Sequence, residues 1–181
     1  MKRLAIAGLL IGALAACSNS TPPAGSSADT SPSAKSSATS PLGAEGVTVT
    51  GVDYAYQGVP ESAKAGSVIT FVNGGNEVHE IVAIRRNEGV TTTLDELLAM
   101  PEEESNKLVS FLGVAVASPG ETAPETITLD QPGNYIFICF IPVGTTELPS
   151  LAPDETPNES LLPDGPPHFV QGMVAEFGVT E

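Results

Sequence analysis

Between residues 46 and 181, apolar residues fall in short runs that alternate with polar residues and are separated by glycine and proline. Residues 47–50 alternate valine with threonine, and residues 67–73 read Ser-Val-Ile-Thr-Phe-Val-Asn before a Gly-Gly pair. Runs of period two that are rich in β-branched and aromatic residues are typical of strands. Runs of this kind cover residues 47–50, 52–56, 67–73, 78–84, 114–117, 125–129, 134–140 and 173–179. The pattern predicts an all-β fold, a Greek-key β-sandwich or barrel of about eight strands.

One segment, about residues 91–112, has a helical period instead. Thr93 and Glu96 match a capping box, in which each residue satisfies a backbone N–H of the other. Pro101 suits the first position of a second helix, and the acidic residues 102–104 suit its dipole. The apolar stripe consists of Leu94, Leu97, Leu98, Leu108, Phe111 and Leu112. We expect a short helical insert that packs on the sandwich and has no chemical role.

The N-terminal 45 residues carry no such pattern and are expected to serve export and attachment. A basic start is followed by an apolar run over residues 4–16, which is too short to span a bilayer and is typical of a secretory signal peptide. The sequence Leu-Ala-Ala-Cys at residues 14–17 resembles the bacterial lipobox, which implies cleavage before Cys17 and lipidation of its thiol. An ordinary signal peptide is the alternative. We expect a signal peptide over 1–16, a lipidated cysteine and flexible Ser/Pro/Ala-rich tether over 17–45, and one domain over 46–181.

The charge of the chain is strongly negative. It has 22 Asp and Glu against 7 Lys and Arg, a formal net charge of −15. Removal of residues 1–16 takes away Lys2 and Arg3 and no acid, which gives −17. Nucleic-acid binding is excluded on this basis, because it needs clustered basic residues. A partner protein with a basic surface is favoured, although the acidity could serve solubility alone.

Candidate chemistry centres on Cys139, the second of two cysteines in a chain expected to be exported. It could be an inert buried thiol, half of an intermolecular disulfide, a nucleophile or a metal ligand. The two histidines of the sequence, His79 and His168, and Met173 make the metal reading more specific. Two imidazoles, one thiolate and a weak thioether form the donor set of electron-transfer copper sites.

Several segments, in their order along residues 46–181, resemble the cupredoxins, the type 1 or blue copper proteins. The matching segments are residues 65–73, 79–80, 119–122, 132–139 and 168–173. The resemblance implies that His79, Cys139, His168 and Met173 bind one copper ion. It also implies that His168 lies near the surface and gives the electron its way in or out. We expect Asn73 to hydrogen-bond close to the ligands and orient them.

A copper ion that is saturated by protein ligands has no open position for a substrate. We therefore expect a membrane-anchored, extracytoplasmic one-electron carrier, a monomer and not an enzyme, with a redox protein as its partner and the membrane contacted only through the lipid. Two alternatives remain open. One is a copper storage, delivery or sensing lipoprotein, and the other is a metal-free sandwich with a structural or interaction role.

One departure from the cupredoxin pattern concerns spacing. Twenty-eight residues, 140–167, separate Cys139 from His168, where the family usually has only a few. Long structureless loops are uncommon inside a compact domain. We expect this proline-rich loop to leave the sandwich and return at Pro166 and Pro167, so that the ligands still converge.

Overall fold

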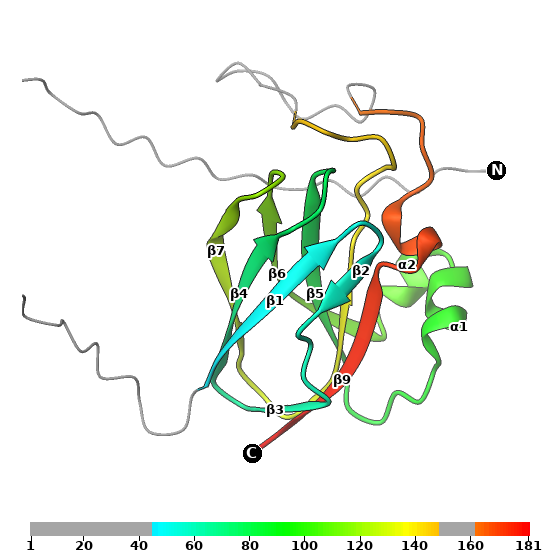
Figure 1. The fold of residues 1–181 in the computed structure, drawn as a ribbon. Coiled ribbons are helices and arrows are strands. Elements are labelled where there is room, and N and C mark those ends of the chain that lie inside the picture. Colours follow the sequence, from blue (N-terminus) through cyan, green and yellow to red (C-terminus); the bar gives the residue numbers. More distant parts are fainter. Residues whose placement is uncertain (1–44, 149–161) are drawn as a thin grey trace, which may run out of the picture. The chain divides into compact units, whose positions relative to one another are not determined.

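The strands of the computed structural model, which describes residues 45–148 and 162–181, form two sheets that pack face to face (Figure 1). The first sheet has the order β2 (Ala55–Gln57), β1 (Gly46–Val52), β4 (Ser67–Asn73) and β7 (Thr122–Leu129). The second has the order β3 (Ser62–Lys64), β9 (Val174–Thr180), β8 (Gly133–Ile138), β5 (His79–Arg86) and β6 (Val109–Ala117). The predicted all-β sandwich is confirmed.

The connections around β5 follow a Greek key. Strand β6 pairs antiparallel with β5, and β7 lies next to β6 across the edges of the two sheets. Strand β8 then returns to pair with β5 on its other side. This order, with the fourth strand beside the first, defines the Greek-key motif.

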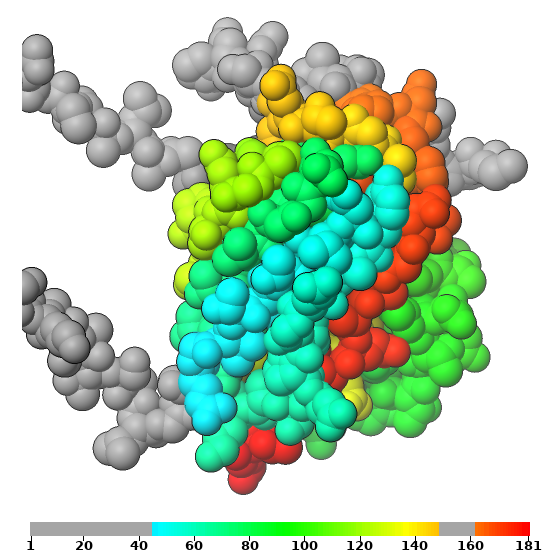
Figure 2. Space-filling model, viewed as in Figure 1, coloured from blue at the N-terminus to red at the C-terminus, as the bar shows by residue number. Residues whose placement is uncertain are grey.

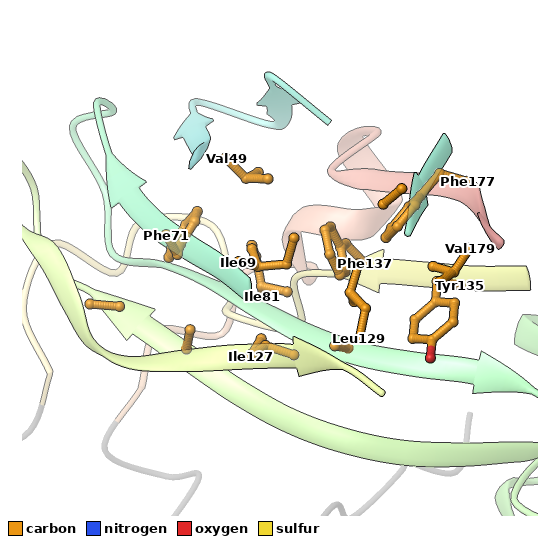
Figure 3. Packing of buried hydrophobic residues seen from close by; sticks show 14 of the residues in the cluster. Val49, Ile69, Phe71, Ile81, Ile127, Leu129, Tyr135, Phe137, Phe177 and Val179 are labelled. Atoms are coloured by element: carbon orange, nitrogen blue, oxygen red, sulfur yellow. The ribbon is translucent and has the colours of Figure 1, made fainter. Parts of the chain in front are cut away.

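The core lies between the sheets and follows from the period-two pattern. In β4, residues 67, 69, 71 and 73 are buried while the residues between them are partly exposed. Ile69 and Phe71 of this sheet meet Ile81 and Phe137 of the other (Figure 3). Alternating side chains therefore seal one face of each sheet against the other.

The helical insert is present but shorter than the sequence predicts. It consists of α1 (Leu94–Ala99) and α2 (Glu102–Ser105), and the capping box at Thr93 is confirmed. Residues 109–112, expected to be helical, instead begin β6. The physical reason is that this segment pairs antiparallel with the end of β5, where Val109 lies opposite Arg86 and Phe111 lies opposite Ile84. This tertiary pairing overrides the local helical period.

Two further differences concern short elements. Strand β3 was not predicted, because three residues with one buried alanine, Ala63, carry too little periodicity. The predicted strand over 52–56 is divided by a turn at Asp53 and Tyr54, and the chain continues as β2.

The long loop returns as predicted. The gold segment after β8 and the orange segment before η2 (His168–Gln171) run together at one end of the sandwich (Figure 1). The N–H of Val143 donates to the carbonyl of Pro166 at 2.9 Å, and Pro142 bridges to Pro167. Figure 2 shows both segments beside the cyan β1–β2 turn.

Other expectations fall outside the described residues. The signal peptide, Cys17, nearly all of the tether and loop residues 149–161 belong to this group. Among the described residues, no helix is both long and apolar enough to cross a membrane.

Candidate metal centre

Three side chains from distant parts of the sequence meet at one end of the sandwich. His79 is the first residue of β5, Cys139 directly follows β8, and His168 is the first residue of η2. The Nδ1 atoms of the two histidines are 3.1 Å apart, and Cys139 Sγ lies 3.3 Å from His168 Nδ1. All three residues are 0% exposed, and one donor atom from each lies within 4.8 Å of the others.

Strand geometry explains the inward direction of His79. In β5, residues 79, 81 and 83 are buried, whereas residues 80 and 82 are only partly buried. Because side chains alternate across a strand, His79 points to the same side as the core residue Ile81. The histidine thus extends the apolar face of β5 to the end of the sandwich.

Backbone hydrogen bonds fix Cys139 and His168 to each other despite the long loop between them. The N–H of His168 donates to the carbonyl of Ile141 at 2.9 Å, and the N–H of Phe169 donates to that of Cys139 at 3.0 Å. The N–H of Cys139 donates to the carbonyl of Met173 at 3.2 Å. The close coupling that a short loop provides is supplied here by these bonds.

Met173 lies directly after this turn and is 0% exposed. It packs in one apolar cluster with Cys139, Val78 and Ile141. A Cβ on Gly51 would come within 3.1 Å of the Met173 methyl group, so glycine leaves the space that the thioether occupies. The structure therefore brings Met173 to the Cys139 side of the site.

Asn73 makes its hydrogen bonds in the turn that leads to His79. Its Nδ2 donates to the carbonyls of Glu77 and Ala117, both at 2.8 Å, and its Oδ1 accepts from the N–H of Gly75 at 2.9 Å. These bonds close the turn before β5 and attach it to β6. Asn73 thus braces the chain that carries His79 and makes no hydrogen bond to the histidine itself.

Two carboxylates that sequence reasoning missed face the histidines from outside. Asp53 Oδ1 lies 3.3 Å from His79 Nε2, and Glu77 Oε2 lies 3.0 Å from His168 Nε2. The spacing Glu-x-His at residues 77–79 was a weak signal for Glu77. No local signal marks Asp53, because only the pairing of β1 with β4 brings its turn to this end.

The electrostatics of the site favour a bound cation. Burial lowers the pKa of His79, opposed by its hydrogen bond to Asp53, so the ring is neutral at pH 7. With its one proton on Nε2 toward Asp53, a neutral His79 presents a bare Nδ1 lone pair to the site. His168 likewise has its Nε2 beside Glu77 and directs its Nδ1 at that of His79. A cation bound by both Nδ1 atoms, which are 3.1 Å apart, would satisfy the two lone pairs together.

Burial also determines the state of Cys139. It raises the pKa of the thiol to about 12, reinforced by the charge of Glu80 and partly offset by backbone hydrogen bonds from Glu80 and Ile141. A protonated, fully buried thiol is a poor nucleophile and cannot reach a second chain to form a disulfide. The alternatives that remain are an inert thiol and a metal ligand, and a metal ligand accounts for the converging imidazoles.

The donor set fits copper better than zinc. Structural zinc sites take four Cys, His or carboxylate ligands, whereas the set here has three such ligands and a thioether beside the cysteine. Two imidazoles, one cysteine and a weak axial methionine are the donors of type 1 copper. The residues present therefore fit this metal.

His168 lies one side chain beneath the surface, under the partly exposed Tyr54 and Glu77. The residue is 0% exposed, because the β1–β2 turn and the start of the long loop cover it. The ring of Tyr54 meets the imidazole edge to face, with centroids 5.2 Å apart, and Glu77 holds Nε2. An electron that passes through His168 must therefore cross this cover.

Comparison with known proteins gives distant structural similarity only. The chain is similar to an auracyanin from the photosynthetic bacterium Roseiflexus castenholzii, with 20% identity, a TM-score of 0.42 and coverage of 77% of this chain and 99% of the auracyanin. It is also similar to auracyanin B, with 21% identity, a TM-score of 0.39 and coverage of 78% and 92%. Auracyanin A of Chloroflexus aurantiacus, described as a "blue" copper protein, shows 17% identity, a TM-score of 0.38 and coverage of 76% and 100%. No protein-family model and no curated protein matches the chain. The case for a metal rests on the converging donors and not on these similarities.

Proposed function

We propose that this protein is a cupredoxin that binds one type 1 copper ion and carries single electrons. His79, Cys139 and His168 would hold the ion, and the Met173 thioether would be a weak fourth donor. The observation that carries the proposal is the convergence of two histidine Nδ1 atoms and one cysteine Sγ within 4.8 Å, in a site where all three residues are fully buried.

Copper supplies a one-electron couple between Cu(II) and Cu(I) when it is bound. The chain supplies a rigid frame: β5 and β8 pair with each other, and η2 is hydrogen-bonded to the end of β8. Donors held in this way keep their places whether or not an electron is present. Little has to rearrange when the electron moves, which is what a carrier requires.

The same features argue against catalysis on a substrate. All three ligands are 0% exposed, which leaves no approach for a substrate. The whole sequence contains two histidines, both used here, so an additional histidine-bound copper has no ligands. We therefore propose a carrier and not an enzyme.

Two other functions fit less well. A copper storage or delivery protein often has Met-rich or His-rich stretches, and this chain has three methionines in all. A metal-free sandwich explains the fold but gives no role to the convergence of two histidines and one cysteine in a buried site. The first alternative is tested below by copper release.

Location and partner form the second part of the proposal. The lipobox-like sequence that ends at Cys17 supports export and attachment to the membrane through lipid alone. We propose that the protein is a monomer. A net charge of −17 after processing supports encounter with a basic redox protein, since charge complementarity chiefly raises association rates.

The test is electron exchange between the copper-loaded chain and a small cationic c-type cytochrome. We expect one electron per copper, with a second-order rate constant that falls steeply as salt is raised from about 10 mM, where the screening length is about 30 Å, to 0.15 M, where it is about 8 Å. Stopped-flow absorbance measures it.

An anionic redox protein of similar potential is the control, and its rate should rise with salt. Rapid transfer of copper to a metal-free acceptor, without electron exchange, would contradict the carrier and support copper delivery.

A further inference from the structure

Each histidine of the metal centre has a carboxylate on the nitrogen that faces away from the site. His79 Nε2 lies 3.3 Å from Asp53 Oδ1, and His168 Nε2 lies 3.0 Å from Glu77 Oε2. The two Nδ1 atoms face each other and Cys139 instead. Both rings therefore have the same orientation, with a carboxylate outside and the donor lone pair inside.

Asp53 is held in place by the neighbouring turn. The backbone N–H of Asn76 donates to its Oδ1 at 2.9 Å, and the side-chain amide of Asn76 donates to its Oδ2 at 2.8 Å. Both oxygens are thus fixed by one residue, and the His79 contact does not depend on the chance rotamer of a surface aspartate.

Glu77 is held from two sides. Its Oε1 accepts from the hydroxyl of Tyr54 at 3.1 Å, and its Oε2 accepts from the N–H of Gly144 at 2.6 Å as well as facing His168. Gly144 lies at the start of the long loop. The carboxylate therefore joins the β1–β2 turn, η2 and this loop over the second histidine.

Two backbone positions, Gly75 and Tyr54, make these contacts possible. A Cβ on Gly75 would lie 2.5 Å from Asp53 Oδ1 and 2.6 Å from His79 Nε2, so only glycine allows this pair to form. Tyr54 has a φ of 67°, a left-handed conformation unusual for a tyrosine. Strained residues persist where surrounding structure enforces them, often next to functional sites. Here the strain places the tyrosine ring on His168 and its hydroxyl on Glu77.

We propose that Asp53 and Glu77 are positioning residues that fix the Nε2–H tautomer of both histidines and stabilise Cu(II) relative to Cu(I). This inference rests on the proposed function. A carboxylate that accepts the outer N–H increases the basicity of the inner nitrogen. A more basic donor and two nearby negative charges favour the higher metal charge, so the pair lowers the reduction potential.

The pairs are not simple ion pairs that stabilise the fold. A neutral histidine gains little from a nearby carboxylate by charge alone, and Asp53 is partly exposed, with 37% of its side chain accessible. A purely structural role predicts a loss of stability on substitution with no change of tautomer or potential. The positioning role predicts a changed tautomer and a changed reduction potential, with little loss of stability.

The first measurement needs neither copper nor a variant. Ring ¹⁵N NMR of the full-length, metal-free chain should show that each histidine, in its neutral form, carries its ring proton on Nε2. The ring proton on Nδ1 at either histidine would overturn the inference whether or not copper binds. In Asp53→Ala, the His79 tautomer should become mixed while His168 is unchanged.

The second measurement is the reduction potential of the copper-loaded Asp53→Asn and Glu77→Gln chains. Each should bind Cu(II) about 10- to 100-fold more weakly, with a smaller loss for Cu(I). Every tenfold change in the ratio of the two affinities raises a one-electron potential by about 59 mV. Glu125→Gln, which removes one exposed carboxylate from β7, is the matched control and should leave the potential unchanged.

The outcomes separate the inference from the proposed function. A wild-type chain that folds but forms no thiolate–copper absorption refutes the copper proposal, and the tautomers still test the positioning role. A wild-type chain that forms this absorption, with variant potentials equal to that of Glu125→Gln, refutes the inference alone.

Discussion

Met173 shows how one residue of the site depends on its neighbours for space. Its side chain is fully buried beside Cys139, and its methyl group occupies room that Gly51 leaves free. A thioether is a weak donor that bears no charge. In the proposed copper site, such a donor would change the reduction potential rather than decide whether the metal binds.

Met173→Leu tests this effect. Leucine has a similar volume but no sulfur, so the fold is kept, and such swaps usually cost less than about 1.5 kcal/mol. We expect the thiolate–copper absorption to persist and the reduction potential to rise, because Cu(II) loses a donor. Cyclic voltammetry measures the change.

Met100→Leu is the matched control, since Met100 belongs to the helical insert and not to the site. An unchanged potential in Met173→Leu, equal to that of the Met100 variant, shows that the sulfur does not interact with the metal.

At the same scale, the sequence predicted the three residues that converge, but not the two carboxylates beside the histidines. His79, Cys139 and His168 stood out because the chain has so few residues of their types. Asp53 is one acid among 22 and meets His79 only through the sheet, so no local pattern marks it. The burial of His168 likewise comes from Tyr54 and Glu77, which are distant in sequence.

The helical insert and β6 show which local sequence patterns predict the observed secondary structure. The capping box of α1 is present: Thr93 accepts from the N–H of Glu96 at 3.3 Å, and Glu96 accepts from the N–H of Thr93 at 2.8 Å. The residues after Leu108, which have a helical apolar period, form a strand instead because they pair with β5. The local hydrogen bonds of the cap were predictable from the sequence. The start of β6 was not, because it depends on pairing with β5, which lies on the other side of the helical insert.

Thr93→Ala tests the role of the insert as a packing element. The loss of a cap costs about 1 kcal/mol, and α1 holds Leu97 against Ile136 and Ile138 of β8. We expect urea unfolding to show a loss of about this size, with the copper absorption unchanged.

Thr91→Ala, an exposed threonine two residues earlier, should have almost no effect. A change in the copper absorption of Thr93→Ala, with stability retained, contradicts a packing role and couples the insert to the metal.

Across the whole molecule, the strand order and backbone hydrogen bonds bring together residues that are far apart in the sequence. The donors lie at residues 79, 139 and 168, yet the Greek key places β5 beside β8, and backbone bonds hold η2 to the end of β8. The sandwich was predictable because period-two runs are a strong signal. The covering of the site was not, because it is built from turns whose contacts are non-local.

The measurement that tests the account most directly is titration of the full-length chain with Cu(II), followed by visible absorption. We predict an intense thiolate-to-copper band that saturates at one equivalent. The band should be absent from Cys139→Ser and retained in Cys17→Ser, which removes the other cysteine of the sequence. A folded wild-type chain that stays colourless, or a band that persists in Cys139→Ser, would contradict a type 1 copper site at these residues.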